Sequence, residues 1–299
     1  MKTLFLSAFL LFSLNFVSFG QIEMESERDN DGVVSIYAIN RTSIPHTVVI
    51  NFSQLQNMTT SGGGNVTALA SPGRSRVATL KPTLSGQGTN YRYSYSYVKG
   101  NLFAKSKTKA VYLIPVEAGH EVMAAQMNPL ATQLDKNEQV GSYVGVSFSF
   151  PSPTAIVAPR KGVVSSMKMD YVGDKENLSF NREENFIELY HEDGTFTKIS
   201  VLKANSAQVK EGDLVFPGDI IAQSGGENYS SGPHVRMINL RPVKKEADKL
   251  GMEAFPVTFV GEKGEISFNQ PEKFTVAHPE EVVIAEMSKR ELKAFQEGK

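Results

Sequence analysis

Hydrophobic and polar positions alternate along most of this chain in short runs, with little of the three-to-four-residue spacing that marks helices. From Gly32 onward, β-branched and aromatic residues gather in runs separated by turn material rich in Gly, Pro, Ser and Asn. The first such runs are VVSIYAIN, TVVINFSQL, VTALA, RVATL, YRYSYSYV and AVYLIPV. Many short strands at this spacing are typical of a β-sandwich. The pattern therefore predicts a β-sandwich domain over residues 21–117.

A second group of strands follows a polar, weakly helical stretch, and we expect that stretch, residues 118–141, to be a connector. The later runs are YVGVSFSF, TAIVAP, GVVSSMKMDYV, NFIELYH, TFTKISVL, GDIIAQSG and HVRMINL. His191–Gly194 predicts a hairpin turn in which Gly194 supplies a positive φ. These strands predict a second, mainly β domain over residues 142–270.

The C-terminal part carries three further expectations. Arg241–Gly251 suggests a short helical insertion, and PVTFVGEKGEISF a further hairpin. Residues 271–299 are expected to be a tail with a short helix from Pro279 onward. Glu286 and Arg290 have the spacing of an i,i+4 ion pair on that helix.

The N-terminus has the three-part form of a secretory signal peptide. Lys2 precedes an apolar run over Leu4–Phe19, and Gly20 is a small residue at the end of that run. The run is too short for a spanning helix, and no later segment approaches the roughly 20 apolar residues that one needs. We therefore expect removal of residues 1–20, no stable membrane insertion, and a location in the bacterial periplasm or exterior. The absence of cysteine excludes disulfides and fits that compartment only weakly.

Charge adds little to this picture. The chain has 31 basic and 32 acidic side chains, for a formal net charge of −1. Such a balance gives no strong overall field, so it argues against a nucleic-acid partner or an anionic membrane surface.

Four tyrosines, Tyr91, Tyr93, Tyr95 and Tyr97, alternate along one predicted strand and so share a face. They could stack on sugars. Aromatic residues are also ordinary strand formers that bury their rings and expose their hydroxyls. We favour the structural interpretation and leave the ligand platform open.

The segment SGPHVRM carries the candidate chemistry. It follows a glycine-rich turn and is predicted to enter a strand, where His234 and Arg236 project from the same face. Two histidines at this spacing could bind one metal. Arginine, however, offers no lone pair and keeps its positive charge.

The second β region resembles the LytM or lysostaphin-type zinc peptidases, which cleave peptidoglycan cross-links. The resemblance covers Tyr143 to Leu240, about a hundred residues, and depends on four segments in order. These are GVSFSFPSPTAIVAPRKGVV, ENFIELYHEDGTFTKISVL, VKEGDLVFPGDIIAQSGG and SSGPHVRMINL. It implies the duplicated β fold of that family for residues 142–270. The preceding sandwich, with INRTSIPHTVVINF, is more loosely similar to a β domain found before this fold in some secreted relatives.

In active members of the family, zinc is bound by an H-x-x-x-D pattern and by the second histidine of H-x-H. A histidine in Y-x-H-L and the first histidine of H-x-H assist the chemistry. The resemblance places Tyr143 and Ser147 at the first pair, Arg236 at the third ligand, Val201 at the Y-x-H-L histidine, and His234 at the remaining position. Only His234 keeps the family's residue type.

These replacements predict loss of the zinc site and of catalysis. Catalytic zinc needs about three protein donors and an open position. Arg236 would place a fixed positive charge near the metal, and Val201 has no proton to transfer. We therefore expect no cofactor, and a groove in which His234, Arg236, Tyr143 and Lys198 bind a carboxylate or amide of a peptidoglycan stem peptide.

Two alternatives stay open. His234 could be a strand histidine that only satisfies a neighbour. Displaced donors could also rescue an active zinc endopeptidase, with His120, Asp135, Asp170 and His191 as candidates. The favoured prediction is a secreted cell-envelope protein whose degenerate LytM-type domain binds peptidoglycan or regulates a cell-wall hydrolase, as degenerate members that activate amidases do.

Overall fold

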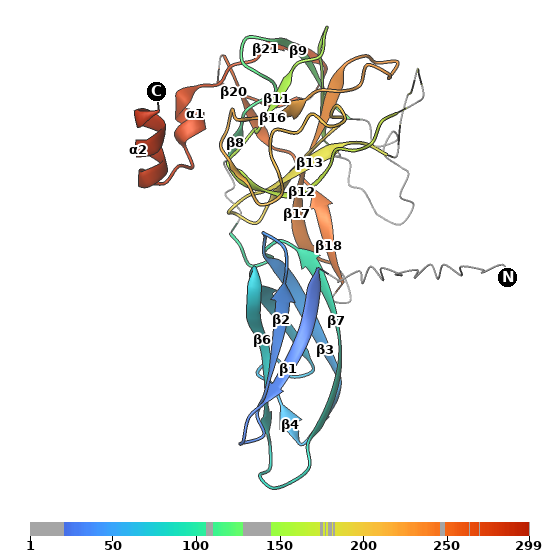
Figure 1. The fold of residues 1–299 in the computed structure, drawn as a ribbon, viewed down its shortest axis with the longest axis vertical. Helices are drawn as coiled ribbons and strands as arrows, with labels where there is room; N and C mark the ends of the chain where they lie inside the picture. The colour runs from blue at the N-terminus through green and yellow to red at the C-terminus, as the bar shows by residue number, and fades with distance from the viewer. Residues whose placement is uncertain are drawn as a thin grey trace, which may run out of the picture.

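The computed structural model describes most of the chain after residue 20. The described residues are 21–105, 110–127, 145–173, 176, 178, 181, 183–245, 249–262, 264–268 and 270–298. The predicted signal peptide lies outside them. Figure 1 shows two lobes, with the N-terminal strands in one and most of the later strands in the other.

The first lobe is a β-sandwich, as predicted. One sheet has the order β1 (Ile22–Arg28), β2 (Val34–Asn40), β6 (Gly73–Pro82) and β4 (Met58–Thr59); the other has β5 (Asn65–Ala70), β3 (His46–Gln56) and β7 (Asn90–Lys99). Alternate residues of β2 are buried, as expected for a strand with one face toward a core. Ile36, Val48, Ile50 and Leu80 belong to the core between the two sheets.

The second lobe contains a larger sheet and two small ones. The nine-stranded sheet runs β15 (Leu214–Val215), β12 (Gly162–Lys168), β13 (Phe186–Tyr190), β14 (Phe196–Ser200), β17 (His234–Lys244), β10 (Val146–Ser149), β9 (Glu121–Gln126) and β21 (Glu272–Thr275), with β18 (Leu250–Ala254) paired to β17. The small sheets are β11 (Ala155–Val157) with β16 (Ile220–Gln223), and β20 (Gly264–Ile266), β19 (Thr258–Gly261) and β8 (Val111–Tyr112). One face of the large sheet covers a core that includes Phe148, Ile187, Ile199 and Val235. The mainly β architecture is therefore confirmed.

The second lobe begins earlier in the chain than we expected. Tyr112–Val116, assigned to the sandwich, contribute buried residues to the second core. Part of the predicted weakly helical connector is strand β9, whose Val122 and Ala124 are buried in the same core. The helical expectation for this part is wrong because alternate apolar residues of EVMAAQ fit a half-buried strand. The rest of the connector lies outside the described residues.

The C-terminal expectations need two corrections, while the predicted hairpin at β19–β20 is confirmed. Arg241–Lys244 continue β17 and pair with β18, so the helical insertion is wrong. The tail contributes β21 to the large sheet and then forms two helices, α1 (Glu280–Ile284) and α2 (Lys289–Glu297). Ser288 caps α2 through a capping box, so Glu286 lies between the helices and not in a continuous i,i+4 pair with Arg290.

Glu286 instead binds the buried Arg160. The Arg160 side chain is 3% exposed; its Nε and Nη2 donate to the two carboxylate oxygens of Glu286 at 2.8 and 2.7 Å. Its Nη1 donates to Tyr112 Oη, Asp193 Oδ2 and Thr195 Oγ1 at 3.0, 3.1 and 3.3 Å. A buried charge is tolerated when its donors are satisfied in this way. Arg160 therefore ties helix α1 to the hairpin after β13.

The predicted hairpin turn at His191–Gly194 is confirmed, with Gly194 at φ +83°. His191 itself is fully buried although it lies at a hairpin turn. Its Nδ1 lies 2.7 Å from the Lys161 carbonyl oxygen, so Nδ1 carries the proton, and Nε2 lies 2.7 Å from Thr197 Oγ1 and accepts from it. The turn packs closely against the segment that leaves the sandwich. A Cβ on Gly194 would lie only 2.7 Å from the Ala104 side chain on that segment.

The tyrosine row on β7 closes the edge of the sandwich. The hydroxyls of Tyr91 and Tyr95 donate to Ser26 Oγ at 3.1 Å and to the Ile22 carbonyl oxygen at 3.2 Å. Tyr93 packs against the sandwich core. These contacts support the structural interpretation of the row.

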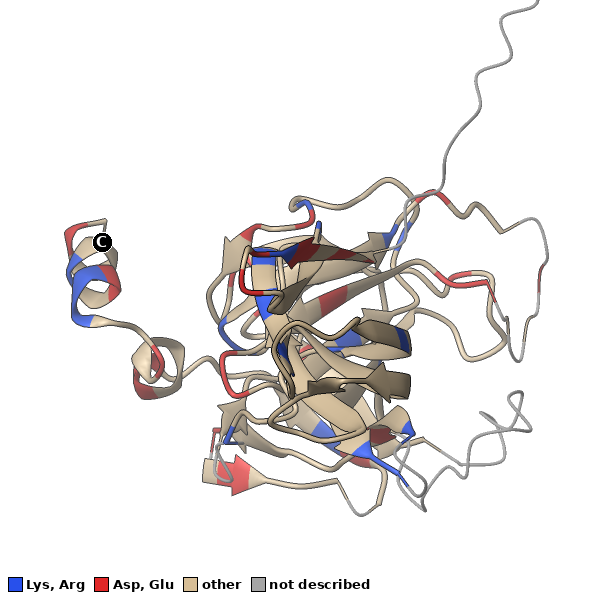
Figure 2. Cartoon of the chain, turned by 90° about the horizontal axis from the view of Figure 1, so that it is seen from below, with Lys and Arg blue, Asp and Glu red and all other residues tan. Residues whose placement is uncertain are grey.

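Charged residues of both signs are interspersed over the strands and loops (Figure 2). Neither helix in the described part of the chain combines the length and hydrophobicity required to cross a membrane.

Acid is expected to weaken the attachment of helix α2. Lys161 Nζ donates to Glu291 Oε2 at 2.8 Å, and this bond, with those from Ser288, lowers the pKa of Glu291 from 4.5 to about 2. Because the folded pKa is the lower one, the stabilisation is present above about pH 4.5 and is lost as pH falls toward 2. Hydrogen-exchange protection of α2 amides, corrected for intrinsic rates, should fall through this window. Lys161→Met should reduce that pH dependence; an equal fall of protection in both proteins would contradict the role of Lys161.

Candidate functional site

The residues singled out in SGPHVRM lie at the centre of the large sheet. Arg236 on β17 is opposite Ser147 on β10 and Ser200 on β14, so these three positions share one face. His234 and Lys198 lie on the same face, two positions away along their strands. The predicted common face of His234 and Arg236 is confirmed. This face is opposite to the one that packs on the core.

Arg236 is held by a carboxylate that the sequence did not indicate. Its Nη1 donates to Glu184 Oε1 at 2.7 Å, and the two side chains are 18% and 15% exposed. The Tyr229 hydroxyl donates to the same oxygen at 3.0 Å, and the guanidinium carbon lies 5.4 Å from the Tyr229 ring centroid. Burial and the adjacent Glu184 raise the pKa of Tyr229, so its hydroxyl stays protonated. Arg236, which the resemblance places at the third zinc-ligand position, is thus paired with a carboxylate.

His234 is buried against the glycine-rich turn that precedes β17. Its Nδ1 lies 2.8 Å from the Gly232 carbonyl oxygen, which makes Nδ1 the protonated nitrogen. Burial lowers the pKa of His234, opposed by the bond to Gly232, so the imidazole is neutral at pH 7. A Cβ on Gly226 would lie 2.8 Å from His234 Nδ1, and Gly226 has φ +91°. The turn therefore requires glycine here to approach the imidazole.

Val201, at the family's Y-x-H-L position, has an unusual backbone. Its φ is +66°, a value that a β-branched residue rarely adopts because its Cβ crowds the backbone. The carbonyl oxygen of Val201 accepts a hydrogen bond from Gly225 N–H at 2.8 Å. Strained backbone of this kind is concentrated at functional sites. Val201 thus has this unusual backbone and a side chain that cannot transfer a proton.

Lys198 lies on the same face but makes no hydrogen bond or ion pair with Arg236. Its Nζ is 4.1 Å from the centroid of the Phe186 ring, and burial lowers its pKa while Glu188 opposes that shift. Glu188 in turn forms an ion pair with Lys99 of the sandwich lobe. Lys198 is thus linked electrostatically, through Glu188 and Lys99, to the junction between the lobes.

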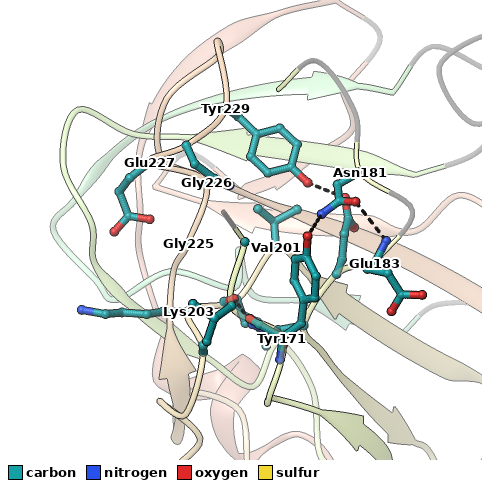
Figure 3. Close-up of a pocket in the computed structure, with 16 residues that line it drawn as sticks. Tyr171, Asn181, Glu183, Val201, Lys203, Gly225, Gly226, Glu227 and Tyr229 are labelled. Atoms are coloured by element: carbon teal, nitrogen blue, oxygen red, sulfur yellow. Dashed lines mark hydrogen bonds between the residues drawn. The ribbon is translucent and has the colours of Figure 1, made fainter. Parts of the chain in front are cut away.

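A cleft of about 320 Å³ adjoins this face (Figure 3). Tyr171, Glu183 and Asn181 lie on one side of it and Tyr229, Gly226 and Glu227 on another, with Val201 and Lys203 between (Figure 3). Glu184 also lines it, whereas His234 and Arg236 are not among its lining residues. Tyr229 and Glu184 therefore stand between the cleft and Arg236. Tyr143 lies outside the described residues.

The donors at this site do not fit a catalytic zinc ion. Ser147 provides a hydroxyl and Arg236 a cation, which leaves the Nε2 of His234 as the one family-position nitrogen with a lone pair among the described residues. The displaced donors do not gather there: His191 uses both nitrogens in the core, and His120 is exposed beside the Glu117 carbonyl oxygen. Asp135 lies outside the described residues. Within the described ranges no three His, Asp or Glu side chains form a group suited to a metal ion.

Glu184 and Tyr229 are the site residues that sequence reasoning missed. The one available signal was indirect, since an arginine on a half-buried face needs a counter-charge. The sequence has 32 acidic side chains, and no spacing rule selects one that lies 52 positions away.

The profile of peptidase family M23 matches residues 141–247. This interval contains β10 to β17 and the cleft residues, and it agrees with the resemblance to LytM-type peptidases. No curated protein sequence matches the chain.

Several solved structures show a more distant likeness. The M23 metalloprotease pseudoalterin is 15% identical, with 54% of this chain and 97% of that chain covered and a TM-score of 0.33. A zinc-containing peptidase from Vibrio cholerae is 16% identical, with 77% and 86% covered and a TM-score of 0.32. The SpoIIQ–SpoIIIAH pore-forming complex contributes a chain at 20% identity, with 45% and 85% covered and a TM-score of 0.32.

Proposed function

We propose that the region matched by peptidase family M23, residues 141–247, has lost catalysis and acts as a binding module of the bacterial cell envelope. Its ligand is a peptide, either a peptidoglycan stem or a segment of a cell-wall hydrolase that the module regulates. The observation that carries this proposal is the Arg236–Glu184 ion pair at a zinc-ligand position. A guanidinium committed to a carboxylate cannot donate an electron pair to a metal.

The cleft supports a binding role. It has aromatic walls from Tyr171 and Tyr229, and charged groups from Glu183, Glu227 and Lys203 at its lining. Such a mixture of apolar walls and a few polar groups is common in sites for small peptides and their side chains. We further propose export, based on the N-terminal segment, as the route by which the protein meets these ligands.

Metal analysis separates this function from peptidase activity. Protein purified without chelator and dialysed against zinc is expected to retain well below one zinc ion per chain by mass spectrometry of the metal. It should bind soluble muropeptides without cleaving them. Stoichiometric zinc together with muropeptide cleavage would establish the alternative, an active endopeptidase with displaced ligands. Pull-down from envelope extract then distinguishes the two binding roles, because a hydrolase regulator should retain a hydrolase reproducibly.

A further inference from the structure

Arg236 has unused hydrogen-bonding capacity. An arginine carries five N–H donors in a planar fork, and the Nη1 bond to Glu184 is the one hydrogen bond that the Arg236 side chain makes with described residues. Arg160 in the same domain differs, since its Nε, Nη1 and Nη2 all donate to protein oxygens. Arg160 is a saturated structural arginine, whereas Arg236 keeps the Nε and Nη2 edge of its fork for another acceptor.

Glu184 has a matching open acceptor. Its Oε1 accepts from both Arg236 Nη1 and the Tyr229 hydroxyl. Its Oε2 accepts from no described residue, and the residue lines the cleft. The pair therefore combines open donors on the guanidinium with an open acceptor on the carboxylate.

This arrangement complements an amide better than a carboxylate. A peptide amide offers a carbonyl oxygen to a guanidinium and an N–H to a carboxylate, and it binds without separating the pair. A free carboxylate must compete with Glu184 for the charge of Arg236.

On the basis of the proposed binding function, we propose that Glu184 is a specificity-determining residue. Paired with Arg236, it makes the site select a neutral amide of a peptide ligand and discriminate against a free carboxylate at the same position. This narrows our expectation from the sequence, which allowed either group.

Two synthetic stem tetrapeptides test this inference, one ending in a D-alanine carboxylate and the other in the corresponding carboxamide. Calorimetric titration of the full chain should give about tenfold tighter binding of the carboxamide, as expected for one unfavourable charge contact. Glu184→Gln frees the charge of Arg236, so the preference should disappear or reverse. Arg236→Gln/Glu184→Gln removes both charges and should bind the two peptides about equally.

Glu253→Gln is the matched control. It also removes a carboxylate that pairs with an arginine of β17, but that arginine is Arg241 and Glu253 does not line the cleft, so the carboxamide should remain preferred. Thermal unfolding checks that each variant is folded. If Glu184→Gln is not folded, the double variant still tests the role of the charge pair, because it should bind the two peptides about equally. An unchanged preference in the folded Glu184 variants, or a wild-type preference for the carboxylate, overturns the role of Glu184 while leaving peptide binding intact. Failure of the wild type to bind either peptide overturns stem-peptide binding together with this inference.

Discussion

Replacing Arg160 with methionine is expected to lower the free energy of unfolding by about 3–5 kcal/mol. Arg160 is nearly inaccessible, and its guanidinium bridges the buried Asp193, the Tyr112 hydroxyl and Glu286 of the C-terminal arm. Methionine fills similar space but leaves the Asp193 carboxylate buried without its counter-charge. Urea denaturation followed by circular dichroism measures the loss.

Arg241→Met is the control for this prediction. Arg241 also forms an ion pair, with Glu253 at 2.8 Å, but the two side chains are 48% and 50% exposed. Water screens such a pair, so its removal should cost less than about 1 kcal/mol. Similar losses in the two variants would contradict a special role for the buried network.

Stability is expected to fall on the order of 3 kcal/mol between about pH 6.5 and pH 4 because of His191 alone. Burial, followed by the neighbouring Arg160, lowers the pKa of His191 from 6.5 to about 4. Each pKa unit corresponds to about 1.36 kcal/mol. Since the folded pKa is the lower one, the unfolded chain binds the proton first; the contribution is complete above pH 6.5 and is lost as pH falls through 4. Chemical denaturation at several pH values gives the slope.

His191→Gln isolates this contribution from carboxylates that titrate nearby. Glutamine can still donate to the Lys161 carbonyl oxygen and accept from Thr197, but it does not titrate. The variant should lose less stability than the wild type across the interval. Parallel curves for the two proteins would mean that another group is responsible.

Much of the fold was predictable because strand periodicity and turn chemistry are local. The alternation in VSIYAIN predicted β2, and Gly194 predicted the hairpin turn between β13 and β14. The errors came from segments whose pattern admits two structures. EVMAAQ was expected to be weakly helical and is strand β9, because the edge of β10 offers it backbone partners that sequence alone does not reveal.

Part of the candidate site was also predictable from the sequence. Strand periodicity placed His234 and Arg236 on one face, and the resemblance identified which ligand positions had changed. Neither strand periodicity nor the resemblance could predict which carboxylate pairs with Arg236, or that a cleft lies beside Tyr229. Both depend on loops that meet only in the folded chain.

By itself, the sequence determined the strand-rich architecture and the residue types at the positions that the resemblance assigns to metal ligands. Side-chain alternation and the chemistry of a donor atom are properties of single residues and their near neighbours. The tertiary structure alone decided that Glu184 neutralises Arg236, that His191 is buried rather than exposed, and that Glu286 reaches Arg160. Each of these depends on residues that are far apart in the sequence and become neighbours only in the folded chain. Burial strengthens their electrostatic interactions, and that burial exists only after the sheets and loops have packed together.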